Sequence, residues 1–197
     1  MSLESAAHLS GLVLLVLCFG SFAWGLRVFF RSVGPTPRGL WLIRTLGTPM
    51  ALGQLWLAVV WPAPASLVTA IAHAMYAAAL ILFWWAARAH AHTPPSLAFS
   101  DDRPTHLVRT GPYRHIRHPF YSSYLLAWMA GAMLTSSWLG SVPVPVMLWL
   151  YVRAARLEEH KFLASTFGAE YEAYLSRAGM FWPRSAFGHR DSSTLRR

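Results

Sequence analysis

The chain has 197 residues, of which 55% are hydrophobic, 14% aromatic and 13% charged. A soluble domain carries roughly 25% charged residues, so this composition excludes an ordinary soluble domain, and the same low charge excludes intrinsic disorder. The net charge of +9 would suggest nucleic-acid binding, but the basic residues are spread thinly between apolar segments and indicate membrane topology instead. We therefore expect an all-α integral membrane protein without a nucleic-acid partner.

The first half of the chain contains three apolar segments. Residues 7–30 are long enough for a membrane span, which needs about 20 residues. A second segment, 46–61, is shorter and can extend back towards Leu40, and a third covers 66–87. Because only residues 62–65 separate the second segment from the third, we expect these two to form an antiparallel hairpin.

The second half begins with a polar segment, 88–118, which we expect to be a structured aqueous loop. A fourth span follows over 120–138. A fifth begins near Val142, with prolines in its first turn, where proline is tolerated. We expect this last helix to leave the membrane and to continue as an amphipathic helix to about Ser176.

The basic residues fix the predicted orientation. Three predicted connections, 1–6, 62–65 and 139–141, contain neither Lys nor Arg. All 17 basic residues lie in 27–44, 88–117 and 153–197. The positive-inside rule then places the amino terminus outside, and the long loop and the carboxyl terminus in the cytoplasm, with five spans.

The length predicts a single domain, 1–197. Within it we distinguish two peripheral spans (1–65), a catalytic core (66–183) and a basic tail (184–197).

The densest chemistry lies between His106 and Tyr121, at the start of the fourth span. This stretch reads HLVRTGPYRHIRHPFY and interleaves cations with aromatic residues, a Gly-Pro turn and a proline that can begin a helix. Taken singly, Arg103, Arg109 and Arg114 are explained by contacts with anionic lipid head groups. That explanation does not account for the Gly, Pro, Tyr and His residues among them.

A second cluster, Arg156-Leu-Glu-Glu-His160, lies where the fifth span leaves the membrane. Ionisable residues at membrane depth are costly and are functional candidates by default. On a helix Arg156 and Glu159 share a face, whereas Glu158 points about a quarter turn away. An ion pair of Glu159 with Arg156 or Arg153 is the simplest structural explanation. Because both clusters lie on the same predicted side, a joint site is favoured.

The two clusters together resemble the isoprenylcysteine carboxyl methyltransferase family, integral-membrane enzymes related to the phospholipid N-methyltransferases. The match covers roughly 66–183. Its signature residues are His106, Leu107, Val108, Gly111, Pro112, Tyr113, Arg117, His118, Pro119 and Tyr121, followed by Arg156, Glu158, Glu159, Phe167, Gly168, Tyr171, Tyr174 and Arg177. Two features depart from the pattern: Ser122-Ser123 replaces a small residue, and a second Arg is missing before the ending FWP.

The resemblance implies an S-adenosylmethionine-dependent methyltransferase whose cofactor pocket lies between the cytoplasmic loop and the carboxyl-terminal helix. A lipophilic or prenylated substrate would enter from the lipid bilayer. The predicted catalytic residues are Arg117, Glu158 and Glu159. The predicted cofactor-binding residues are His106, Leu107, Val108, Gly111, Tyr113, His118, Pro119, Tyr121 and Glu159.

Either carboxylate, Glu158 or Glu159, can hold the cofactor's ammonium group or ribose hydroxyls. The tyrosine rings can wall the adenine or the sulfonium, and Gly111 permits close backbone approach.

The acceptor decides the remaining chemistry. A carboxylate acceptor is already ionised near pH 7, so alignment and desolvation suffice, and Arg117 would anchor it through a bidentate contact. An amine acceptor must lose a proton to Glu158, Glu159 or His118. The carboxyl group of a prenylcysteine is the preferred acceptor, and an amine-bearing phospholipid is the alternative.

Two further readings remain. A membrane reductase of the steroid-reductase type would use NADPH and could bind its 2′-phosphate through Arg103, Arg109 and Arg114, and a non-catalytic membrane protein would bind no nucleotide. The sequence does not fix the oligomeric state.

We expect no metal site. His90 and His92 have only Asp101 and Asp102 as possible further ligands, and His73 is interpreted as a hydrogen-bonded residue of the helix bundle.

Overall fold

The computed structural model describes residues 3–30, 38–91, 95 and 104–184. In this part of the chain the ordered elements are helical. They are α1 (Leu3–Trp24), the π-helical η1 (Gly25–Phe29), α2 (Arg38–Val60), α3 (Leu67–Ala89), the 3₁₀ helix η2 (Gly111–Arg114), α4 (Pro119–Met133), the 3₁₀ helix η3 (Trp138–Ser141), α5 (Pro143–Leu163) and α6 (Gly168–Arg177). The predicted all-α fold is confirmed for these residues. The second apolar segment, 46–61, does extend back beyond Leu40, since α2 begins at Arg38.

Local sequence explains where the helices begin. The backbone N–H of Ser66 donates to Thr69 Oγ1 at 2.8 Å and so closes the start of α3. Both α4 and α5 begin at a proline, Pro119 and Pro143, whose missing N–H is not needed in the first turn of a helix.

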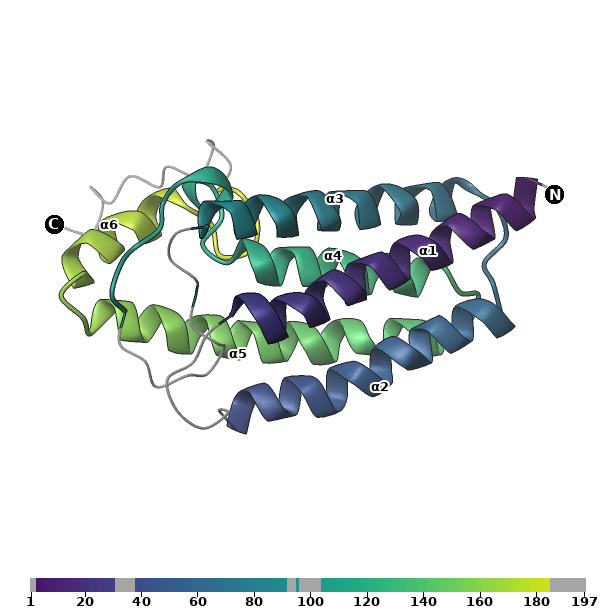
Figure 1. Ribbon diagram of the computed structural model, residues 1–197, viewed down its shortest axis with the longest axis horizontal. Coiled ribbons are helices and arrows are strands. Elements are labelled where there is room, and N and C mark those ends of the chain that lie inside the picture. Colours follow the sequence, from purple (N-terminus) through teal and green to yellow (C-terminus); the bar gives the residue numbers. More distant parts are fainter. Residues whose placement is uncertain (1–2, 31–37, 92–94, 96–103, 185–197) are drawn as a thin grey trace, which may run out of the picture.

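Helix α4 lies at the centre of the bundle, surrounded by α1, α2, α3 and α5 (Figure 1). Its closest neighbour is α3, whose Ala72, Ala79 and Ala86 are fully buried at intervals of seven residues. Small side chains at this spacing form one helical stripe and allow two helices to approach closely.

The predicted hairpin of the second and third helices is correct in direction but not in packing. Helices α2 and α3 run antiparallel, yet α2 packs mainly against α5, whereas α3 packs against α4 and α1 (Figure 1). The connection crosses the end of α4, because the N–H of Ala63 donates to Leu134 O at 2.9 Å. The side chain of Gln54 also fixes α2, since its Nε2 donates to Trp128 O at 3.1 Å and to Gly140 O at 2.8 Å.

The predicted fourth span, 120–138, is too long. Helix α4 ends at Met133 because the residues that follow bond to the α2–α3 connection. Thr135 Oγ1 donates to Trp61 O at 2.9 Å, and the N–H of Ser136 donates to the same carbonyl at 3.0 Å. These bonds take the chain out of the helical path.

The predicted continuous last helix is also wrong, because it breaks between Leu163 and Gly168. The Ser165 hydroxyl donates to Phe162 O at 2.7 Å and accepts from the Phe167 N–H at 3.1 Å. A Cβ at Gly168 would lie 2.6 Å from Leu163 O, so the turn depends on glycine. As a result α6 folds back towards the loop that precedes α4 (Figure 1).

Three helical stretches of the described chain are long and apolar enough to cross a membrane: Glu4–Phe29, Leu67–Ala89 and Trp138–Leu163. Helix α2 is long enough but less apolar. Helix α4 has 15 residues and, at 1.5 Å per residue, spans about 22 Å of a hydrocarbon core about 30 Å thick. The predicted count of five spans is therefore not confirmed.

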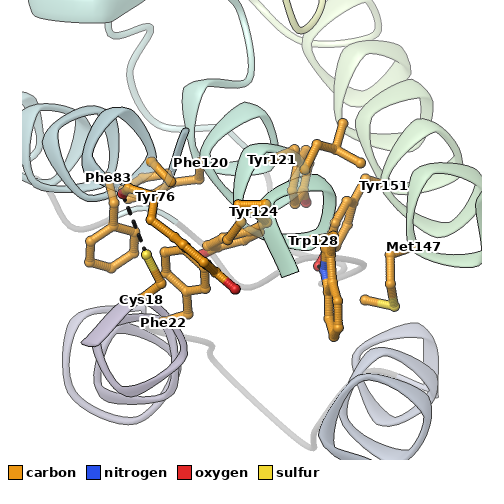
Figure 2. Packing of buried hydrophobic residues seen from close by; sticks show 14 of the residues in the cluster. Cys18, Phe22, Tyr76, Phe83, Phe120, Tyr121, Tyr124, Trp128, Met147 and Tyr151 are labelled. Atoms are coloured by element: carbon orange, nitrogen blue, oxygen red, sulfur yellow. Dashed lines mark hydrogen bonds between the residues drawn. The ribbon is translucent and has the colours of Figure 1, made fainter. Parts of the chain in front are cut away.

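Aromatic side chains join the helices in the core. The ring of Phe22 on α1 lies 4.6 Å from that of Tyr124 on α4 and 5.2 Å from that of Phe83 on α3, and Figure 2 shows these rings gathered around α4. On the other side of α4, Tyr121 stacks on Tyr151 of α5 with centroids 5.2 Å apart. The core therefore connects α1 and α5 to α4, the helix at the end of residues 106–121, which we call the signature segment.

Candidate functional site

The signature segment is held by the stretch that follows α6. The N–H of Arg117 donates to Gly179 O at 2.8 Å and that of His118 to Met180 O at 3.1 Å, while the Gly179 N–H donates to His115 O at 3.0 Å. The Ser122 hydroxyl donates to Phe181 O at 2.6 Å. This pairing joins residues 59 to 64 positions apart and was not foreseen from the sequence.

The Arg117 side chain binds the protein through two of its three guanidinium nitrogens. Its Nε donates to Glu159 Oε1 at 2.8 Å, and its Nη1 donates to Ala178 O at 2.5 Å and contacts Leu175 O at 3.5 Å. The two side chains of the ion pair are only 11% and 13% exposed. A guanidinium binds a carboxylate bidentately through Nη1 with Nη2, or through Nε with Nη2. Either mode would need a nitrogen that now holds Glu159 or Ala178.

His118 lies between two carboxylates. Its Nε2 is 3.1 Å from Glu159 Oε1 and its Nδ1 is 3.4 Å from Glu158 Oε2. Burial lowers the pKa of this imidazole, but the hydrogen bonds and charges of Glu158 and Glu159 outweigh burial and raise the pKa above its ordinary value. Carboxylates only accept hydrogen bonds, so both contacts favour the imidazolium, which donates from both nitrogens.

The structure distinguishes the two adjacent glutamates. Glu158 lines a cavity and accepts a hydrogen bond from the Tyr121 hydroxyl at 2.5 Å. Glu159 is outside the residues that line this cavity and binds Arg117 and His118. The expected ion pair of Glu159 with Arg156 or Arg153 is not found among the described contacts. Arg153 instead lies over the Trp149 ring, 5.7 Å from its centroid.

The cavity has a volume of about 470 Å³ and joins two different environments. Its polar end lies at the signature segment and the loop before it, and its apolar end reaches into the bundle between α1, α2, α4 and α5. The predicted residues that line it are His106, Leu107, Val108, Tyr113, Arg117, His118, Tyr121 and Glu158.

Two predicted cofactor residues have structural roles at this site. Gly111 has φ of 58°, and a Cβ there would lie 3.2 Å from Trp85 Nε1 and 3.3 Å from Ala89 Cβ. Its close backbone approach is therefore to α3 and not to the cavity. Pro119 is buried as the first residue of α4.

Several cavity residues were not among the predicted site residues. Tyr171 and Tyr174 on α6 line the polar end, together with Phe162 and Lys161 on α5. The spacing of three between the tyrosines could have indicated one helical face. The hydroxyl of Tyr174 donates to Tyr113 O at 2.5 Å, so α6 closes over the signature segment.

Two histidines outside the signature segment, His90 and His73, have different surroundings. His90 ends α3, lies 5.0 Å ring to ring from Tyr113 and lines the cavity. His73 bonds to Thr69 O at 2.6 Å and Ala7 O at 3.0 Å, which confirms that it is a hydrogen-bonded residue of the bundle. Among the described residues no three His, Cys, Asp or Glu side chains lie together as a metal site would require. The predictions for Arg103, His92, Asp101 and Asp102 concern residues outside the described part.

The apolar helices indicate an integral membrane protein, and one cavity joins the charged signature residues to the interior of the helix bundle. Residues 67–170 match the phospholipid methyltransferase family. The chain belongs to this family.

Similarity to individual proteins is partial. A nickel-cobalt-cadmium resistance protein of Alcaligenes xylosoxydans xylosoxydans is 32% identical over 101 residues, which are 51% of this chain and 46% of that protein. Probable protein-S-isoprenylcysteine O-methyltransferases of the indica and japonica subspecies of Oryza sativa are each 35% identical over 72 residues, which are 36% of this chain and 37% of theirs. The chain thus matches less than half the length of each relative, and the isoprenylcysteine enzymes agree with the resemblance of the signature.

Proposed function

We propose that this protein is a membrane methyltransferase that uses S-adenosylmethionine to methylate a lipophilic acceptor at the cytoplasmic membrane face. The preferred acceptor is the carboxyl group of a prenylcysteine-like amphiphile. The observation that carries the proposal is the single continuous cavity, with signature residues at its polar end and the bundle interior at its apolar end. Membership of the phospholipid methyltransferase family supports a methyltransferase over the NADPH-dependent reductase.

The residues at the polar end fit the proposed cofactor. Glu158 offers a carboxylate on the cavity wall for an ammonium group. Tyr113, Tyr171 and Phe162 offer aromatic faces for an adenine ring or a sulfonium. When bound there, S-adenosylmethionine supplies an activated methyl group.

Neighbouring side chains hold the two glutamates in fixed positions. Tyr121 and His118 hold Glu158 from two sides, and Arg117 holds Glu159, so the carboxylates are fixed before a ligand binds. In this proposal Glu158 binds the cofactor, whereas Glu159 and Arg117 position the signature segment. This assigns Arg117 a positioning role in place of the predicted anchoring of the acceptor carboxylate.

The same contacts favour an acceptor that is already ionised. Both oxygens of Glu158 interact with protein donors, Tyr121 and His118, so uptake of a proton would break one of these contacts. A carboxylate acceptor needs no base. Phospholipid amine methylation remains the second candidate because of the family to which the chain belongs.

The proposed topology keeps five membrane-crossing helices, with the short α4 enclosed by its neighbours and the amino terminus outside. The 17 Lys and Arg residues of the sequence all lie in segments assigned to the cytoplasmic side.

Thermal unfolding of the detergent-solubilised protein tests the function. S-adenosylhomocysteine should stabilise the wild type, and NADPH should not. Glu158→Gln should weaken S-adenosylhomocysteine binding about tenfold, as expected when a charge-assisted hydrogen bond of about 1.5–3 kcal/mol is lost. Glu172→Gln is the matched control, because Glu172 is exposed on α6 and outside the cavity.

The outcomes separate the hypotheses. If neither S-adenosylhomocysteine nor NADPH stabilised a folded sample, both enzyme hypotheses would be refuted. Stabilisation by NADPH alone would favour the reductase. Radiolabelled methyl transfer to a farnesylcysteine derivative or to phosphatidylethanolamine then distinguishes the two acceptors.

A further inference from the structure

A basic residue from outside the family-matched region lines the same cavity. Arg44 lies on α2, is exposed, and forms part of the cavity wall together with Thr48, four residues later on the same helical face. The family match begins only at residue 67. Helices α1 and α2 therefore add a wall that lies outside the family-matched region.

The surroundings of Arg44 are largely apolar. Leu40, Ile43 and Leu52 line the cavity from the same helix, and Leu26 and Phe30 line it from the end of the first helical stretch. A guanidinium beside apolar surface is stabilised by an anionic partner more than by a neutral one.

The nearby carboxylates have other partners. Glu159 pairs with Arg117 and His118, and Glu158 contacts Tyr121 and His118. Arg44 is not part of any ion pair among residues 3–30, 38–91, 95 and 104–184. Its charge is thus directed to the cavity without a carboxylate from this part of the protein to neutralise it.

Arg117 does not supply this function, since its Nε and Nη1 hold Glu159 and Ala178. The part of the cavity wall that α2 forms therefore has Arg44 as its candidate for anion recognition.

We propose that Arg44, assisted by the Thr48 hydroxyl, binds the anionic group of an amphiphilic methyl acceptor, either a carboxylate or a phosphate. The apolar part of the acceptor would lie along Phe22 and Met147 inside the bundle, where both residues line the cavity. This inference rests on the proposed methyltransferase function and assigns acceptor selection to α2.

Equilibrium binding in a neutral detergent, followed by tryptophan fluorescence with saturating S-adenosylhomocysteine, tests the inference. The carboxylate arm compares N-acetyl-S-farnesylcysteine with its neutral amide. The phosphate arm compares palmitoyl lysophosphatidic acid with monopalmitoylglycerol, which lacks only the phosphate. Arg44→Gln is compared with Arg27→Gln, because Arg27 is also exposed near the predicted cytoplasmic face but does not line the cavity.

Arg44→Gln should weaken one anionic probe about tenfold and change its neutral partner and S-adenosylhomocysteine by less than about twofold. Arg27→Gln should leave all of these affinities at the wild-type level. The anionic probe whose affinity falls shows whether Arg44 binds a carboxylate or a phosphate. Retained S-adenosylhomocysteine affinity shows that the variant is folded.

Two results would overturn the inference while leaving the proposed function intact. In the first, Arg44→Gln binds both anionic probes as tightly as the wild type does. In the second, Arg44→Gln loses as much affinity for the neutral probes as for the anionic ones. A wild-type protein that binds S-adenosylhomocysteine but prefers neither anionic probe over its neutral partner would also overturn it. Failure of the folded wild type to bind S-adenosylhomocysteine would instead refute the proposed function.

Discussion

Replacing Arg117 by Gln should destabilise the whole signature region and not only reduce turnover. The Arg117 side chain bonds to Glu159 Oε1 and to the carbonyls of Ala178 and Leu175, and it is 11% exposed. A hydrogen bond to a charged group contributes about 1.5–3 kcal/mol, and breaking a buried pair costs about 3–5 kcal/mol. Because His118 still partners Glu159 in the variant, we expect a loss of about 3 kcal/mol in the free energy of unfolding.

A double-mutant cycle isolates the ion pair. Unfolding of Arg117→Gln, Glu159→Gln and the double variant in mixed micelles should give a coupling energy of about 1–3 kcal/mol. Arg114→Gln is the control, because Arg114 is an exposed arginine three positions earlier, and it should change stability by less than about 0.5 kcal/mol. If Arg117→Gln were no more destabilising than Arg114→Gln, or if the cycle gave no coupling, the assigned positioning role would be wrong.

Two further predictions concern the same region. Gly111→Ala should cost about 1–2 kcal/mol of unfolding free energy, because φ is 58° there and the added Cβ meets Trp85; in contrast Gly53→Ala, on a helix with open space, should stabilise by up to about 1 kcal/mol, and equal effects in thermal unfolding would refute the argument. His118 has a folded-state pKa raised above its ordinary value of 6.5, so its contribution should be complete below pH 6.5 and decline as the pH rises through the folded-state pKa. The difference in unfolding free energy between wild type and His118→Asn should therefore shrink as the pH is raised. A difference that grows would contradict the assignment of His118 as a protonated imidazolium.

The signature residues were predictable because they are close in sequence and chemically unusual. His118, Tyr121 and Glu158 do meet at one cavity wall. What the pattern did not determine is which adjacent glutamate lines the cavity, since that depends on the rotation of α5 against α4. The turn at Ser165 was also missed, because apolar periodicity continues across it and side-chain bonds to the backbone decide where the helix ends.

The count of five membrane spans is not confirmed, because α2 and α4 each differ from a typical spanning helix. Helix α4 is apolar but has only 15 residues, because the residues after Met133 bond to the α2–α3 connection. Helix α2 is long enough but carries part of a cavity wall. Composition alone therefore predicts neither where α4 ends nor that one face of α2 lines a cavity.

Rigid support and selectivity come from different parts of the chain. The fixed part consists of the signature segment, α5 and the stretch after α6, which lock Arg117, His118 and both glutamates through mutual contacts. The second part consists of α1 and α2, which lie outside the family match and line the apolar end of the cavity. Substitutions in α2 such as at Arg44 should therefore change which acceptor binds and spare the cofactor, whereas substitutions at Arg117 should affect both, because the segment that it holds forms the cavity wall.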